Sequence, residues 1–317
     1  MKSYRYSAVT AMLCSALFLA ACAGDGADNS ANVNNDTKVE GQVTGDGSST
    51  VAPIIEGIVE IYAAEQPDVK VSSGVSGTGG GFEKFIAGET DFSNASRKIK
   101  EEEAAALKEA GIDYTELELA YDGITIVVSP ENDWVEDLTI DELKKIWIED
   151  GTKKTWADIR EGWPDEPIEY YSPGTDSGTY DYFNEIVLGE SDMVRTATLS
   201  EDDNVLVQGV KGSPNAIGYF GYAYYQENKD ALKDIPIDSG NGPVEPTHET
   251  IRSGDYSPLS RPLYVYVKNS SITENPAAAD FITFTINHAG EMSEAVGYVS
   301  SPQEVYDEDL KAIEALK

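Results

Sequence analysis

The chain has 317 residues, enough for about two domains with full hydrophobic cores. Its 57 Asp and Glu residues outnumber its 23 Lys and Arg residues, which gives a formal net charge of -34. This charge excludes a general basic surface for nucleic acid, so we expect no nucleic-acid partner. The acidic residues are scattered along the chain, which is typical of solvated faces, and we interpret them as an adaptation to a salty environment.

The first residues have the pattern of a secretory signal. Lys2 and Arg5 precede an apolar run, Ala8 to Ala21, that is short for a membrane span. The run ends in Leu19-Ala20-Ala21-Cys22, which resembles the lipobox of bacterial lipoproteins. The resemblance implies a signal peptide over residues 1–21, lipidation of Cys22, and an extracytoplasmic protein anchored to the membrane. An ordinary secretory signal is the alternative.

Residues 22–38 predict a flexible tether between this anchor and the folded part. They are rich in Asn, Asp, Gly and Ala, and a segment of this composition cannot bury a core. Because Cys14 leaves with the signal and Cys22 carries the lipid, the mature chain keeps no cysteine for a disulfide or a thiolate metal site.

Two strand–turn–helix units open the folded part. A strand over 39–44 leads to a turn that ends in Ser49 and Thr50, before a helix with Pro53 in its first turn. A strand over 69–75 leads to a glycine-rich turn that contains Thr78. Hydroxyl and N–H groups at a helix start can hold an oxyanion. The turns lack the Rossmann fingerprint and the Gly-Lys pair of a P-loop.

A third predicted strand, over 90–96, ends in Ser96 and is followed by Arg97. Arginine offers a planar fork of donors that matches a tetrahedral oxyanion. A surface salt bridge is the alternative role of Arg97 in so acidic a chain.

Further elements alternate between helix and strand, which predicts the α/β class. We expect a helix over 100–110, two strand runs within 117–129 around Tyr121-Asp122-Gly123, a capping box over 139–142, helical and strand-like segments over 204–210 and 216–225, an irregular connection over 233–260, a strand over 262–268 and a helix over 276–290.

The segment Ser172 to Thr179 repeats the pattern of the first two turns. It follows a strand-like run, 168–171, and places Ser177, Gly178 and Thr179 at the start of a helix. Alone, Ser177 would be explained as an N-cap. Three such turns, two early in the chain and one in the middle, indicate a ligand cleft between two domains.

Several motifs, in this order, resemble the phosphate-binding proteins of bacterial phosphate ABC transporters, in the periplasmic-binding-protein superfamily. They cover nearly all of the chain after Val39. The motifs are Gly47-Ser48-Ser49-Thr50, Ser76-Gly77-Thr78-Gly79-Gly80-Gly81-Phe82, Asp91-Phe92-Ser93-Asn94-Ala95-Ser96-Arg97, Leu138-Thr139-Ile140-Asp141-Glu142-Leu143, Thr175-Asp176-Ser177-Gly178-Thr179 and Asn215-Ala216-Ile217-Gly218-Tyr219.

The resemblance implies a two-lobed type II periplasmic-binding-protein fold. Lobe I would span 39–120 plus 237–317 and lobe II 121–236, joined by two crossover strands and closing over phosphate. It implies a monomer that passes phosphate to a membrane permease, with no metal and no cofactor. Residues at matching positions would hold the anion: Ser49, Thr50, Thr78, Ser96, Ser177, Gly178 and Thr179.

The chain departs from the family pattern at two positions. Some members have Asp where Ser96 stands, and Arg where this chain has Pro173. Because Arg97 and Asp176 stand beside those positions, we expect a swapped arrangement, with Arg97 as the cation and Asp176 as the acceptor of the phosphate proton.

Other functions stay open at this stage. The cleft could take another oxyanion, such as sulfate or molybdate. A secreted phosphatase or serine hydrolase is disfavoured because Ser177 lacks the Gly-x-Ser-x-Gly elbow and the chain has two His residues, His248 and His288. A surface adhesin would not need three anion-binding turns.

Overall fold

The computed structural model describes residues 39–175, 177–189 and 191–317. The expected signal peptide, Cys22 and the tether lie outside these residues, as does Asp176. Every helix in the described ranges is too short or too polar to span a membrane.

A mixed sheet organises the described part of the chain. Its strands follow the spatial order β2-β1-β3-β12-β4-β8-β6-β7. β1 is parallel to β2 and β3, and β6 is parallel to β7 and β8, whereas β12 and β4 are antiparallel to their neighbours. The strands are β1 (Gly41–Gly47), β2 (Val69–Ser73), β3 (Phe92–Ala95), β4 (Tyr114–Val128), β6 (Glu169–Pro173), β7 (Thr198–Ser200), β8 (Ala216–Gly221) and β12 (Ser260–Lys268).

Helices alternate with these strands, which confirms the predicted α/β class. They are α1 (Ala52–Glu65), α2 (Gly77–Ile86), α3 (Glu101–Glu109), α4 (Ile140–Trp147), α5 (Trp156–Ile159), α6 (Gly178–Phe183), the π-helix η1 (Asn184–Leu188), α7 (Asp203–Lys211), α8 (Tyr222–Asn228), α9 (His248–Ser253), α10 (Asn269–Glu274), α11 (Pro276–Ala295) and α12 (Gln303–Leu316). Short strands complete the fold: β5 (Leu138–Thr139), β9 (Lys233–Asp234), β10 (Ile237–Asp238), β11 (Pro243–Val244) and β13 (Val299–Ser300).

Helix α1 shows how the apolar pattern sets the position of the first turn. Ile54, Ile55, Ile58 and Tyr62 recur at helical spacing, and all four side chains are buried. Pro53 lies in the first turn, where its missing N–H costs no hydrogen bond. The helix is therefore held against the core by one face, and its N-terminus is fixed at the end of β1.

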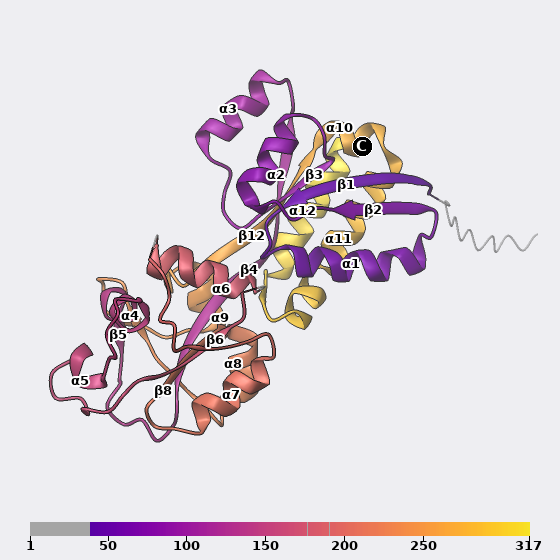
Figure 1. Ribbon diagram of the computed structural model, residues 1–317. Helices are drawn as coiled ribbons and strands as arrows, with labels where there is room; N and C mark the ends of the chain where they lie inside the picture. The colour runs from indigo at the N-terminus through magenta and orange to yellow at the C-terminus, as the bar shows by residue number, and fades with distance from the viewer. Residues whose placement is uncertain (1–38, 176, 190) are drawn as a thin grey trace, which may run out of the picture. The chain divides into compact units, whose positions relative to one another are not determined.

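Strand β4 passes from one hydrophobic core to another. Leu117 and Leu119 pack in a core with α1 and α11, whereas Ile124 and Ile126 pack in a core with α4, α7 and β8. β12 runs antiparallel beside β4 (Figure 1). The prediction of two strand runs around Tyr121-Asp122-Gly123 was wrong, because β4 is one strand. Its pairing with β12 reaches Gly123, its pairing with β8 begins at Ile124, and Ile251 packs against Gly123.

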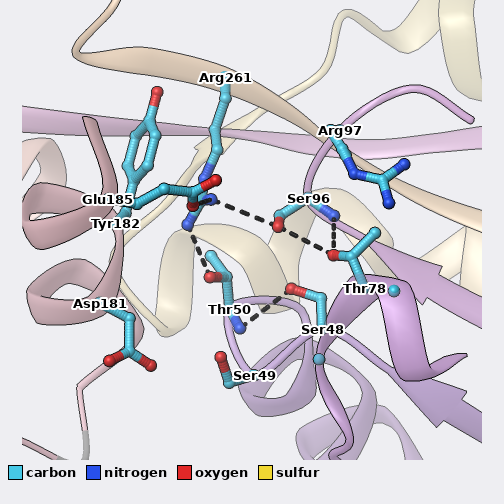
Figure 2. A pocket seen from close by; sticks show the side chains of 12 residues that line it. Ser48, Ser49, Thr50, Thr78, Ser96, Arg97, Asp181, Tyr182, Glu185 and Arg261 are labelled. Atoms are coloured by element: carbon cyan, nitrogen blue, oxygen red, sulfur yellow. Dashed lines mark hydrogen bonds and ion pairs between the residues drawn. The ribbon is translucent and has the colours of Figure 1, made fainter. Parts of the chain in front are cut away.

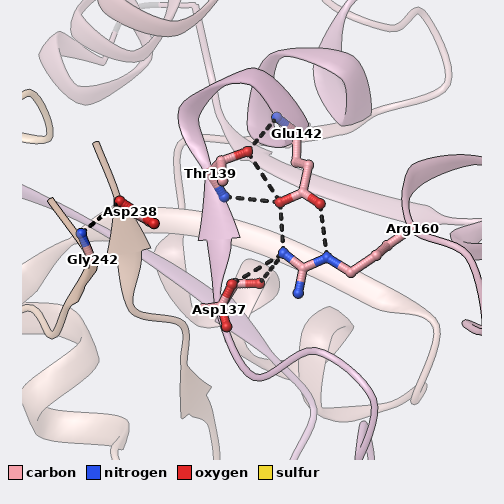
Figure 3. A network of polar contacts seen from close by, with 6 residues as sticks. All are labelled: Asp137, Thr139, Glu142, Arg160, Asp238 and Gly242. Carbon is pink, nitrogen blue, oxygen red and sulfur yellow. Dashed lines mark hydrogen bonds and ion pairs between the residues drawn. The ribbon is translucent and has the colours of Figure 1, made fainter. Parts of the chain in front are cut away.

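The segment 233–260 is more ordered than the predicted connection. It contains β9, β10, β11 and α9, and it buries Ile237, Ile251, Tyr256 and Leu259 in the second core. β10 pairs with β5, which leads into α4. Figure 3 shows the predicted capping box at this helix start, where the Thr139 hydroxyl accepts from the Glu142 N–H at 3.1 Å. The Glu142 carboxylate in turn accepts two hydrogen bonds from Arg160.

An aromatic cluster anchors α6. Trp147 of α4 meets Phe183 of α6 and Tyr219 of β8 edge to face, with ring centroids 5.4 Å and 5.1 Å away. Phe183 and Tyr219 stack at 3.9 Å. All three side chains are fully buried. Large buried aromatic surfaces contribute strongly to packing, so this cluster fixes the helix that follows the third predicted turn.

Candidate functional site

A polar cavity of about 290 Å³ lies where β1 and β3 end and α1 and α2 begin. Figure 2 shows its lining side chains, most of them hydroxyl or charged groups. The lining residues are Ser48, Ser49, Thr50, Gly77, Thr78, Gly79, Ser96, Arg97, Asp181, Tyr182, Glu185 and Arg261. Five of the predicted site residues are among them: Ser49, Thr50, Thr78, Ser96 and Arg97.

The hydroxyl groups meet because the strands that carry them are parallel neighbours. β1 pairs with β3, so the turns after these strands emerge at the same edge of the sheet. The Thr78 and Ser96 hydroxyls lie 3.1 Å apart, and the Ser96 N–H donates to the Thr78 hydroxyl at 3.2 Å. The Ser48 hydroxyl accepts from the Thr50 N–H at 3.2 Å. The structure therefore brings Ser48, Thr50, Thr78 and Ser96 together at one cavity.

Two glycines allow this convergence. A Cβ on Gly81 would lie 2.5 Å from the Cα of Gly47, so α2 contacts the end of β1 backbone to backbone. At Gly81 this close approach is to the neighbouring strand, and it brings Thr78 to the cavity.

The third turn lies beside the same cavity. Ser177, Gly178 and Thr179 line an adjoining cavity of about 240 Å³, which also has Ser49 in its lining. A Cβ on Gly178 would lie 3.0 Å from the Cα of Thr50, so this turn packs directly against the first one. Ser177 is also the N-cap of α6, since its hydroxyl accepts from the Thr179 N–H at 3.2 Å. Asp176, beside it, lies outside the described residues.

Arg261 is a cavity residue that the sequence did not reveal. Its Nη2 donates to the Thr50 hydroxyl at 2.7 Å and its Nη1 to the Ser96 hydroxyl at 3.3 Å. Its guanidinium lies 3.5 Å from the ring centroid of Tyr182, a cation–π contact, and its side chain is 12% exposed. A nearly buried guanidinium thus touches two of the predicted hydroxyl residues (Figure 2).

Asp122 lies behind this arginine. Its carboxylate is fully buried and 3.4 Å from the Nε of Arg261. Within the described residues its Oδ1 has no hydrogen-bond partner. Burial raises the pKa of Asp122, and the Arg261 charge acts in the opposite direction.

Arg97 lines the cavity, but its guanidinium is already paired. Its Nη1 and Nη2 donate to the two carboxylate oxygens of Glu103 at 2.8 Å and 2.7 Å. This fork-to-fork pair raises the pKa of Arg97. The guanidinium also lies 5.5 Å from the ring centroid of Phe82. Of the two roles considered from the sequence, anion-binding cation and salt-bridge partner, the structure shows the salt bridge.

Two carboxylates face the cavity from α6 and η1. Asp181 and Glu185 are both exposed, and an oxygen of Glu185 lies 3.7 Å from the Nη1 of Arg261. Burial raises the pKa of Asp181, Arg261 opposes this rise and Glu185 adds to it. Among the described residues, no cluster of three or more His, Cys, Asp or Glu side chains is placed to hold a metal ion.

Comparison with known proteins gives consistent matches. The sequence matches the profile of the PBP superfamily domain over residues 32–288. It is 45% identical over 304 residues to the phosphate-binding protein PstS of Staphylococcus haemolyticus, across 95% of this chain and 94% of that protein. The crystal structure of a possible phosphate binding protein from Planctomyces limnophilus is 44% identical and covers 88% of this chain and 99% of its own, with a TM-score of 0.84.

A more distant structure has the same fold. An ABC-type phosphate transport receptor from Vibrio cholerae matches 82% of this chain and 100% of its own, with a TM-score of 0.61 at 24% identity.

Proposed function

The chain belongs to the PstS family of phosphate-binding proteins within the PBP superfamily, and we propose that it binds inorganic phosphate outside the cytoplasm and delivers it to a phosphate ABC transporter. Members of this family are binding proteins, so the chain is not an enzyme. Its α/β fold, with β4 running between two hydrophobic cores, is the fold of this family.

The observation that carries the proposal is the convergence of donors on one small cavity. Hydroxyls of Ser49, Thr50, Thr78 and Ser96 come from three separate segments, and the guanidinium of Arg261 comes from a fourth. The N-termini of α1 and α2 lie at the same place and favour an anion through the helix dipole. A tetrahedral oxyanion, with acceptors on all sides, fits such a set of donors.

Arg261, rather than Arg97, is the proposed main cation of the phosphate site. We infer that its fork binds the anion, because its hydrogen-bond partners in the cavity are the neutral hydroxyls of Thr50 and Ser96, and its ion pair with the exposed Glu185 is longer, at 3.7 Å. Arg97 stays a proposed phosphate ligand with a smaller contribution to the binding free energy, because phosphate would compete with the two hydrogen bonds that Arg97 donates to Glu103. Asp176 stays the proposed acceptor of the phosphate proton.

The third turn supports a closing cleft. We propose that Ser177, Gly178 and Thr179 complete the phosphate site from lobe II, and their contact with Thr50 supports this. The proposed lobes are 39–120 plus 237–317, and 121–236. The packing of Ile237 and Leu259 in the second core favours a second crossover close to Arg261, with 237–259 in lobe II.

The proposed location of the chain is the outer face of the membrane, beside a membrane permease. Cys22 would carry the lipid anchor, and the tether over residues 22–38 would hold a monomeric binding protein near its membrane permease. The family membership supports the transporter context. The lipobox-like sequence before Cys22 supports the anchor.

Isothermal titration calorimetry of the mature protein tests the proposed function. We expect saturable binding of one phosphate per chain, with weak or no binding of sulfate and molybdate. Incubation with a chromogenic phosphate ester tests the alternative of a phosphatase, and we expect no turnover. Tighter binding of sulfate or molybdate than of phosphate would overturn the proposal.

A further inference from the structure

The cavity proposed to bind an anion is itself faced by negative charge. Asp181 and Glu185 belong to the second core's side of the cavity, opposite the hydroxyl groups of the first. Either carboxylate repels an incoming phosphate dianion, and this repulsion is strongest at low ionic strength, where salt screens exposed charges least.

Glu185 occupies a particular position among these groups. One of its oxygens lies 3.7 Å from the Nη1 of Arg261, and the same Nη1 donates to Ser96 at 3.3 Å. The Glu185 carboxylate lies next to the guanidinium in the lining of the cavity (Figure 2). An oxygen of a bound anion would compete with it for Nη1.

The Glu185 side chain is also free to leave this position. It is 74% exposed, whereas Arg261 is 12% exposed and held by Thr50 and Asp122. An exposed ion pair contributes little free energy, so an anion can displace the glutamate at small cost while the arginine stays in place.

We infer that Glu185 is an internal competitor for the anion site, which neutralises Arg261 in the empty cavity and is displaced by phosphate. The inference rests on the proposed function of the site. Because displacement of the carboxylate costs the same for every ligand, it leaves the ratio of their affinities unchanged and lowers all of them. A dianion with several acceptor oxygens still binds after this cost, whereas a monoanion such as chloride, which gains less from the same donors, is kept from occupying the site.

The test compares Glu185→Gln with the wild-type chain by phosphate titration at low ionic strength. Gln keeps the shape of the side chain and removes its charge. We expect phosphate to bind more tightly to the variant by roughly three- to tenfold, the range set by one exposed ion pair and one removed repulsion. We also expect added chloride to weaken phosphate binding to the variant more than to the wild type.

Two matched variants separate this effect from a change in net charge. Glu314 of α12 is also 74% exposed and pairs with Lys317 at 3.2 Å, so Glu314→Gln removes the same charge outside the cavity and should leave phosphate affinity unchanged. Asp181→Asn removes the other cavity carboxylate and keeps the Glu185–Arg261 pair, so its gain in affinity should be smaller than that of Glu185→Gln.

Thermal melting confirms that each variant is folded before titration. Saturable phosphate binding by the wild type with unchanged or weaker binding by Glu185→Gln would overturn the inference and leave the proposed function intact. An equal gain in affinity in Glu314→Gln would also overturn it. Failure of both wild type and Glu185→Gln to bind phosphate would overturn the proposed function together with the inference.

Discussion

Arg261 and Asp122 are direct cross-strand partners in the antiparallel pair β12–β4. Their side chains meet at 3.4 Å, with the aspartate fully buried and the arginine at the cavity wall. A buried charge needs a partner, so the two residues hold each other in place. The strand pairing thus delivers an oriented guanidinium to hydroxyl groups that lie more than a hundred residues away in the sequence.

Selectivity between phosphate and sulfate should depend on a carboxylate that accepts the P–OH proton, and Asp176 is the residue we propose. Asp176→Asn should lose phosphate affinity and gain measurable sulfate binding, because the amide adds a donor and removes a repelling charge. Titration of both anions checks this. If the variant still rejects sulfate as strongly as the wild type, the carboxylate that accepts the phosphate proton lies elsewhere, and Asp122→Asn is the next comparison.

Gly178 should be needed for binding more than for folding. In Gly178→Ala the added methyl group would lie 3.0 Å from the Thr50 Cα, which pushes the third turn away from the first. Overpacking of this kind costs about 1–3 kcal/mol, so phosphate affinity should fall by roughly 5- to 150-fold. The melting temperature without phosphate should change little, since the contact joins elements of two different cores. Wild-type affinity in this variant would contradict the proposed role of the turn.

Several residues that line the cavity could be predicted from the sequence, because the order of strand, turn and helix can be recognised locally. Turns after parallel strands share one edge of a sheet, so Ser49, Thr78 and Ser96 could be brought together without knowing any distance. Arg261 could not be placed in this way. Its position depends on the antiparallel register of β12 with β4, and no local pattern specifies which residues of two distant strands are opposite each other.

Local amino-acid composition led to wrong predictions at two places in the chain. Asp122-Gly123 has the composition of a turn, yet β4 continues through it because β12 pairs with β4 as far as Gly123 and β8 pairs with it from Ile124 onward. The Gly- and Pro-rich segment 233–260 has the composition of a loop, yet its few large apolar residues complete the second core. In both cases tertiary packing overrode the local preference.

Asp309 should make stability depend on pH. Burial raises the pKa of Asp309 from an ordinary value of 3.8 to about 7, and the charges of Glu118 and Glu116 add to this rise. The hydrogen bond that its carboxylate accepts from the Glu118 N–H at 2.9 Å lowers the pKa and opposes the rise. The folded state binds the Asp309 proton more tightly than the unfolded chain does. The stabilisation of the fold by protonated Asp309 is therefore complete below about pH 4 and is lost as the pH rises through 7.

Asp309→Asn keeps an acceptor for the Glu118 N–H and cannot ionise. The variant should therefore melt at a higher temperature than the wild type at pH 8 and at a similar temperature at pH 4. Asp307→Asn, on an exposed position of the same helix, is the control and should not change this pH dependence. A wild type at least as stable as Asp309→Asn at pH 8 would show that Asp309 is not protonated in the folded protein near neutral pH.

Membrane attachment should depend on Cys22. Expression of the full chain with Cys22→Ser should move the protein from the membrane fraction to the soluble fraction, because a lipid chain is the membrane-seeking group that the lipobox-like sequence implies. Fractionation followed by immunoblotting measures this. Retention of the variant in the membrane would contradict lipidation at this residue.

Phosphate titration of Arg261→Gln tests whether Arg261 is the main cation that binds phosphate. Arg97→Gln is the matched variant in the same cavity. A charge-assisted fork contributes about 2–3 kcal/mol, so Arg261→Gln should weaken phosphate binding by roughly 30- to 150-fold. Arg97→Gln should weaken it less, because Arg97 is already paired with Glu103. Near wild-type affinity in Arg261→Gln would show that phosphate does not bind in this cavity through Arg261.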